Sequence, residues 1–165
     1  MQERNRGMAT GITNIVKDGT PEQKFLFFAS QERLDDLKAL LADSSVDVNV
    51  TPDPNKLTAL HLCGHHGKLE AVQFLVDHGA DVNCLDAAGY TPLISAAGNG
   101  HYRIVAALLA KGADLTPRVA LGAQKGANAW DVAHRGNSLG HLNASVLLRR
   151  AGCDTTADWR PEKEW

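Results

Sequence analysis

The sequence has few aromatic residues, few cysteines and no excess of either charge. Phe, Trp and Tyr make up 5% of its 165 residues, and 17 Lys and Arg stand against 19 Asp and Glu. The net charge of −2 leaves no basic surplus to neutralise a phosphate backbone, so no nucleic-acid partner is expected. With 44% hydrophobic and 22% charged residues, the composition is that of a folded domain and excludes a disordered chain.

Long hydrophobic runs are also missing. The longest apolar stretch, residues 104–110, is far shorter than the ~20 residues of a membrane-spanning helix, so no span is expected. The amino end carries charges but no continuous apolar core, unlike a secretory signal, which makes the cytoplasm the expected compartment. The three cysteines contain no CxxC pair, which favours free thiols over a disulfide framework or a zinc site.

An internal repeat is the strongest feature that the sequence does contain. A shift of 33 residues aligns LTALHLCGHHGKLEAVQFLVDHGADVN, which begins at Leu57, with YTPLISAAGNGHYRIVAALLAKGADLT, which begins at Tyr90. Looser copies flank these two, so the chain is predicted to contain four units, at approximately 24–49, 50–83, 84–115 and 116–154. Residues 1–23 then form a polar N-terminal extension and residues 155–165 a C-terminal tail.

Each unit is predicted to form two short antiparallel helices followed by a turn. In the third unit Thr91 can cap the first helix, Pro92 suits its first position, and Gly100 can end it in the left-handed conformation. The second helix then runs from about His101 to Gly112, with its apolar residues spaced to form one stripe. These stripes are expected to face the neighbouring units.

The motifs resemble those of ankyrin repeats, in which a Thr-Pro-Leu-His start, a Gly between the helices and a Gly-Ala-Asp-Val-Asn end recur. TALH, GADVN, TPLI and GAD occupy these places in the two central units. The resemblance implies an all-α solenoid of paired antiparallel helices with hairpin-like loops. Lys56 stands where the family usually has Gly, Ala59 where it has Pro and Ile94 where it has His, so local turn geometry is expected to vary there.

The last unit is longer than the others, with about four extra residues in the hairpin segment and three after the first helix. Both insertions are expected to be loops. The first insertion contains Val119 and Leu121, which are expected to be exposed, and it is a candidate contact for a partner. The alternative is that it is only a longer turn without a role in binding. Trp130 is expected in the core. Asp36 in the first unit and Arg149 in the last replace apolar residues, as suits units that cap an array.

No motif points to catalysis or to a cofactor. The sequence has no glycine-rich phosphate loop after a strand, no GxSxG and no HExxH, so the chain is expected to be no enzyme and to need no cofactor. His61, His65 and His66 could share a metal ion, because the first two lie four residues apart on one helix. The resemblance instead gives His61 a hydrogen bond that holds the local turn, and no metal site is expected.

Ankyrin-repeat partners usually contact the hairpin tips and the exposed side of each first helix. Position by position, the resemblance implies a partner-binding track, which consists of Ser30, Gln31, Asn55, Leu57, His65, His66, Ala88, Tyr90 and Asn99. Tyr90 is the best single anchor, because tyrosine offers a large, rigid contact area with a polar end. The alternative is that Tyr90 packs across neighbouring hairpins.

The sequence therefore predicts a non-enzymatic protein-interaction module that acts as an adaptor, an inhibitor or a regulatory subunit, with another protein as its partner. Two alternatives stay open. One is a structural subunit built permanently into a larger assembly, and the other is a metal- or ligand-responsive sensor that uses the three histidines.

Overall fold

The computed structural model describes residues 17–43 and 46–153, which contain helices and no strand. The rest of the predicted N-terminal extension, residues 1–16, and the tail at 155–165 lie outside the described residues. The helices are α2 (Pro21–Ser30), α3 (Leu34–Ala42), α4 (Ala59–His66), α5 (Leu69–Asp77), α6 (Pro92–Gly98), α7 (Tyr102–Ala110), α8 (Ala129–His134) and α9 (Leu139–Arg150).

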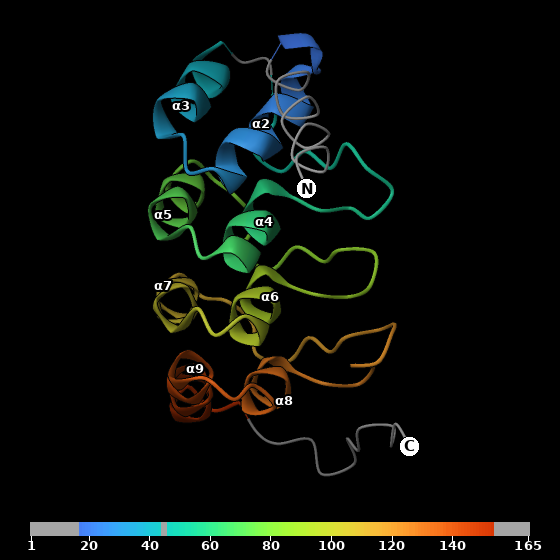
Figure 1. The fold of residues 1–165 in the computed structure, drawn as a ribbon, viewed down its shortest axis with the longest axis vertical. Coiled ribbons are helices and arrows are strands. Elements are labelled where there is room, and N and C mark those ends of the chain that lie inside the picture. Colours follow the sequence, from blue (N-terminus) through green and yellow to red (C-terminus); the bar gives the residue numbers. More distant parts are fainter. Residues whose placement is uncertain (1–16, 44–45, 154–165) are drawn as a thin grey trace, which may run out of the picture.

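The helices form four pairs that stack in one column (Figure 1). The first helices of the pairs, α2, α4, α6 and α8, form an inner row, and the second helices, α3, α5, α7 and α9, form an outer row. Long loops precede α4, α6 and α8 and project on the side of the inner row. The predicted all-α solenoid of helix pairs is confirmed.

A polar side chain caps the start of every inner helix. Its oxygen accepts a hydrogen bond from the backbone N–H three residues later, which satisfies one of the free donors of the first turn. The capping residues are Thr20, Thr58, Thr91 and Asn128. Because Thr20 caps α2, this helix begins at Pro21, three residues before the predicted start of the repeats at residue 24, and that boundary stays a prediction.

The turns keep their geometry where the sequence departs from the family pattern. Gly89 adopts a left-handed backbone with φ of 83°, and Lys56, at the same place one unit earlier, adopts φ of 55°. A side chain in this region costs roughly 1–2 kcal/mol. The expected change in turn geometry at Lys56 is therefore absent, and the second unit carries local strain in its place.

Asparagine side chains link the segments that end the first three units. The Oδ1 atom of Asn49 accepts the N–H of Asp81 at 2.8 Å, and Oδ1 of Asn83 accepts the N–H of Asp114 at 2.7 Å. Asp81 and Asn83 belong to the Gly-Ala-Asp-Val-Asn segment of the second unit, and Asn49 and Asp114 stand at the matching places of the units before and after it. The same hydrogen bond therefore recurs from unit to unit and holds the stacking register.

Histidines at the start of the outer helices provide a second recurring link. Nε2 of His101 donates to the backbone oxygen of His65 at 3.0 Å, and Nε2 of His141 donates to that of Gly98 at 2.9 Å. Gly100 has φ of 72°, and a Cβ placed on it would lie 2.8 Å from Nδ1 of His141. Glycine is thus required at this link for its backbone conformation and for space.

Apolar side chains from all four pairs form a continuous core. Its largest fully buried members are Phe25, Leu37, Leu60, Leu75, Leu93, Ile94, Ile104, Leu108 and Leu148. Both rows of helices contribute to this set. Each pair thus buries apolar surface against its neighbours, as the repeat pattern predicts.

The insertions of the last unit correct two expectations. Val119 is 2% exposed, and its backbone pairs with Gly126 and Ala127, so it belongs to the base of the loop; Leu121 is 59% exposed, as expected. The second insertion forms no loop. It adds a turn to the start of α9, which begins at Leu139 behind the cap Ser138.

The end of the column carries apolar side chains that no further helix pair covers among the described residues. Trp130 is half-buried, packs against the core and stacks on His134 with ring centroids 4.5 Å apart, so it lies at the edge of the core and not in its interior as expected. On α9, Leu139, Leu142 and Val146 are exposed. Arg149, which replaces an apolar residue of the pattern, is exposed on the same helix.

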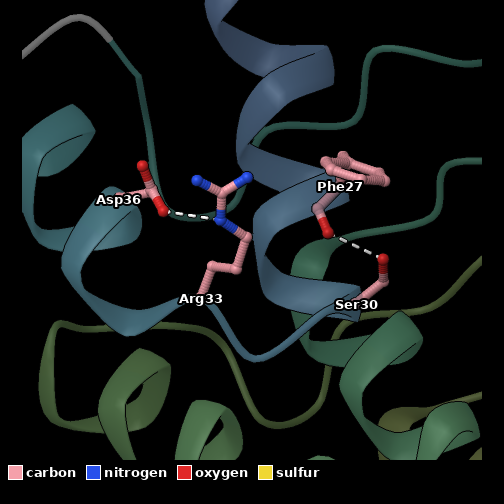
Figure 2. A network of polar contacts seen from close by, with 4 residues as sticks. All are labelled: Phe27, Ser30, Arg33 and Asp36. Atoms are coloured by element: carbon pink, nitrogen blue, oxygen red, sulfur yellow. Dashed lines mark hydrogen bonds and ion pairs between the residues drawn. The ribbon is translucent and has the colours of Figure 1, made fainter. Parts of the chain in front are cut away.

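The first unit has the polar outer helix expected of a cap. Asp36 on α3 is half-exposed, and its Oδ2 accepts from Nε of Arg33 at 2.7 Å (Figure 2). The Arg33 guanidinium lies 4.6 Å from the centre of the Phe28 ring, which adds a cation–π contact. Arg33 thus joins the start of α3 to α2 through one ion pair and one ring contact.

Membrane insertion has no candidate helix in this part of the chain. None of the described helices combines the length and the apolar character needed to cross a bilayer.

The stacking register predicts the effect of a core truncation. Leu93→Ala removes a side chain with 0% exposure between two units and should lower the free energy of unfolding by about 2–5 kcal/mol, through lost burial and a residual cavity. Urea unfolding measures this change. Leu121→Ala, at a 59% exposed site, is the control and should change stability by less than about 0.5 kcal/mol. Equal midpoints for the two variants would contradict the register.

Candidate protein-binding groove

A groove follows the loop-facing side of the inner helices. Its main hollow, of about 560 Å³, lies over α4, α6 and α8 and the loops before them. Its apolar lining comes from Leu57, Leu62, Ile94 and Val132. Its polar lining includes His61, His65, His66, Asp86, Tyr90, Ser95, Asn99 and Gln124. An apolar floor with convergent polar groups is the usual composition of a binding site.

A second hollow continues the groove toward the first unit. It measures about 410 Å³ and lies between α2, α4 and the loop before α4. Phe27 and Leu26 line its apolar side. Leu62 and His66 line both hollows, so the two are neighbours that share one ridge on α4.

Most of the predicted binding track lines these hollows. The main hollow contains Leu57, His65, His66, Tyr90 and Asn99, and the second contains Ser30. A smaller hollow at the loops before α4, α6 and α8, of about 360 Å³, contains Asn55 and Ala88 together with Leu121. Their role in binding stays a prediction.

The first-unit end of the track is the weakest part of the predicted surface. The Ser30 hydroxyl donates to the backbone oxygen of Phe27 at 2.7 Å (Figure 2), and Nε2 of Gln31 donates to the Ser30 hydroxyl at 3.3 Å. Gln31 lines none of the three hollows. The local hydrogen bonds therefore occupy Ser30, and Gln31 lies beside the groove.

Tyr90 is held by a hydrogen bond to the following loop, and its role as an anchor stays a prediction. It is half-buried, and its hydroxyl donates to Oε1 of Gln124 at 3.0 Å. Burial raises the pKa of the Tyr90 hydroxyl, with Asp86 adding to the effect. Tyr90 thus packs across neighbouring loops, as the alternative interpretation proposed, while part of its ring still lines the groove.

His61 supports the groove from below. Its Nδ1 accepts from the N–H of Thr58 at 3.3 Å, and its Nε2 donates to the backbone oxygen of Tyr90 at 2.9 Å. The ring therefore fastens the start of α4 to the next loop, as the resemblance implied. Burial, the largest influence, lowers the pKa of His61, against smaller opposing effects of the Tyr90 oxygen and the Asp86 charge.

The three histidines do not form a metal site in this arrangement. Both ring nitrogens of His61 are engaged, and His65 and His66 contact each other edge to face, with centroids 4.9 Å apart. Across residues 17–43 and 46–153, no three His, Cys, Asp or Glu side chains are grouped so that they could hold a metal ion. The described geometry therefore gives no support to a metal-responsive sensor, and the ligand-responsive form of that alternative stays untested.

The groove includes residues that the sequence interpretation missed. Phe27, Leu62, Ile94, Ser95 and Val132 line it but were absent from the predicted track. Leu62 and Ser95 lie 33 residues apart, at the same position of successive units. This 33-residue spacing could have revealed the two residues, because Leu62 and Ser95 are half-buried at the same position of their first helices.

Comparison with known proteins identifies the family. A family model described as ankyrin repeats, in three copies, matches residues 26–119. This range is more than half of the chain, and the chain belongs to the ankyrin-repeat family. The fourth pair, α8 and α9, follows the matched range. Ankyrin repeats are protein-interaction modules. The prediction of a protein-interaction module is therefore confirmed, without a particular partner.

Three relatives illustrate the family. A 26S proteasome non-ATPase regulatory subunit 10 of Dictyostelium discoideum is 34% identical over 103 residues, which are 62% of this chain and 44% of the relative. Human protein phosphatase 1 regulatory subunit 27 is 44% identical over 64 residues, 39% of this chain and 42% of that protein. The mouse B-cell lymphoma 3 protein homolog is 33% identical over 123 residues, 72% of this chain and 26% of the relative. The chain spans less than half the length of each.

The lowered pKa of His61 predicts how stability depends on pH. The unfolded chain binds the proton more readily than the folded one, so the free energy of unfolding is greatest above the ordinary His pKa of 6.5 and decreases as pH falls through it. Urea unfolding between about pH 7.5 and about pH 5.5 tests this. His61→Gln should lose about 1 kcal/mol at the higher pH, with the bond to Tyr90, and should show a flatter pH dependence.

The control for this experiment is a histidine on the other face. His78 is exposed on the outer side of α5, so His78→Gln should keep the pH dependence of the parent protein. If His61→Gln retained the full dependence instead, another group would be responsible for it.

Proposed function

We propose that this chain is a non-enzymatic interaction module that binds a segment of another protein in the groove over α2, α4, α6 and α8. The observation that carries the proposal is the pair of adjoining hollows along the inner row. Together they extend from α2 to α8 and are lined by apolar side chains with polar side chains at their edges. A surface of this shape suits an extended chain segment, because alternating apolar and polar contacts along its length can all be satisfied.

The chemistry of the groove supports binding over catalysis. Cys84 Sγ lies 3.7 Å from Nδ1 of His61, a contact that could activate a thiol in another setting. Here burial raises the pKa of Cys84, which disfavours the thiolate, and Nδ1 already accepts from Thr58. The Cys84 thiol is therefore not activated as a nucleophile by His61.

The relatives support a regulatory role. Two of the three named above are regulatory subunits, one of the 26S proteasome and one of protein phosphatase 1. We propose that this chain likewise acts as an adaptor or regulatory subunit. The stoichiometry of the purified complex distinguishes this role from a permanent structural subunit.

A variant that fills the groove tests the proposal. Ser95 is half-buried on α6 and lines the main hollow, so Ser95→Arg should place a bulky charged side chain there with little effect on the core. The partner that co-purifies with the parent chain should bind this variant at least about tenfold more weakly, which corresponds to about 1.4 kcal/mol. Titration calorimetry or surface plasmon resonance measures the change.

The matched control adds the same side chain to the opposite face. Ala106 is exposed on the outer helix α7, and Ala106→Arg should leave the affinity unchanged. Thermal melts confirm that both variants fold. Loss of binding with Ala106→Arg and normal binding with Ser95→Arg would place the partner on the outer row and overturn the proposal.

A further inference from the structure

Two histidines occupy the ridge between the hollows of the groove. His65 and His66 end α4, both are exposed, and their rings meet edge to face with centroids 4.9 Å apart. His66 lines both hollows, and His65 lines the larger one. Any segment that places side chains in both hollows must therefore pass over this pair.

The pair presents hydrogen-bond donors to the groove. Nδ2 of Asn99 donates to the backbone oxygen of Ser95 at 2.8 Å and lies 3.0 Å from Nδ1 of His65. Because an amide nitrogen only donates, Nδ1 of His65 accepts and the proton of the neutral ring is on Nε2. The His66 ring forms no hydrogen bond with any residue that the structure describes.

The charges nearest the pair are basic. Lys68 immediately precedes α5, and His101 immediately precedes α7 and donates to the backbone oxygen of His65. Both lower the pKa of His66, together with His65, although burial is the largest cause. Each of these influences favours the neutral ring in the unbound protein.

The acidic groups around the groove already accept backbone hydrogen bonds. Asp86, from the loop before α6, accepts from the N–H groups of Ala88 and Tyr90, and Asp53, from the loop before α4, accepts from that of Leu57. On the side of the first unit, the Glu32 carboxylate accepts from the N–H of Glu70. These bonds hold the carboxylates to the backbone, and the donors of the histidine pair are left for a partner.

We infer that the His65–His66 pair recognises an acidic side chain of the partner segment, flanked on each side by an apolar residue that enters one of the two hollows. This inference rests on the proposed function and names the partner chemistry of the same groove. A carboxylate accepts from the donors of both rings, and its charge complements Lys68 and His101.

A pH dependence follows from the same contact. A bound carboxylate favours the charged imidazolium, so binding is accompanied by proton uptake, and affinity should increase as pH falls through the His range. Because the pKa of His66 is lowered in the free protein, the increase in affinity is expected at slightly acidic pH. Carboxylates titrate near pH 4 and stay charged throughout this window.

Selected peptides can represent the partner segment and test the inference. A phage-displayed library of short random peptides is selected on the full chain at about pH 6, with Ser95→Arg used to remove sequences that bind elsewhere. Enriched peptides are then synthesised with each Glu or Asp and with the matching Gln or Asn. Fluorescence polarisation measures their affinity for the parent chain and for the variant His65→Gln/His66→Gln.

The expected result is an acidic residue between two apolar ones in the enriched peptides. Its amide replacement should weaken binding to the parent about tenfold, but less than about twofold for the double variant. The parent should also bind the acidic peptide more tightly at about pH 6 than at about pH 7.5. His78→Gln, on the outer row, is the control and should behave as the parent does.

The outcomes separate the two proposals. Peptides that bind the parent and not Ser95→Arg, yet show no preference for the acid or no response to the double variant, overturn the inference and leave the groove function standing. A selection that enriches no peptide on the parent relative to Ser95→Arg counts against the groove function itself. Thermal melts at both pH values show that the variants remain folded.

Discussion

Burial of apolar surface between successive helix pairs is the interaction on which the rest of the structure depends. No pair encloses its own apolar face, so each is stable only against its neighbours. Close approach is part of this arrangement. A Cβ at Gly64 of α4 would lie 2.9 Å from the backbone oxygen of Pro92, which begins α6. The small residue lets the two inner helices pack at the distance that the buried leucines and isoleucines require.

Hydrogen bonds then select one register among the stackings that apolar burial alone would permit. The asparagine and histidine links described above each join a side chain of one unit to a backbone group of a neighbouring unit, at equivalent positions of successive units. A displacement by one residue would leave these groups without their partners, at a cost comparable to several lost bonds. The loops therefore occupy fixed positions, and the groove between loops and inner helices has a defined shape.

The sequence predicts the elements and the order of the fold well, because its turns depend on local chemistry. Thr91 caps the start of α6, and Gly100 supplies the left-handed turn between α6 and α7. Both roles follow from conformational preferences of the residue types themselves. The start of α2 is harder to find, because Thr20 lies in a copy too weak to align. The extra turn of α9 looks like a loop when its residues are compared with the other units, unless Ser138 is recognised as a cap.

The groove is predicted less well, because its surface depends on contacts between residues far apart in the chain. The bond between Tyr90 and Gln124 joins two loops of different length, and no spacing rule reveals it. Val119 looks exposed in a polar segment, yet the pairing of its backbone turns it inward. Residues of the inner helices are easier to place. His65, His66 and Asn99 lie at repeated positions whose side chains face the loops.

The position of the groove within the column has a consequence for its dynamics. The main hollow centres on α4 and α6, which have a helix pair on either side, whereas α2, which lines the second hollow, and α9 belong to pairs with one described neighbour. In a stacked array, local opening begins at the ends, where fewer interfaces must be broken. Amide hydrogens of α4 and α6 should therefore exchange with solvent most slowly. A binding surface built on the slowest-exchanging pairs loses little conformational entropy when a partner is captured, and the ordering cost of the complex falls mainly on the partner's segment.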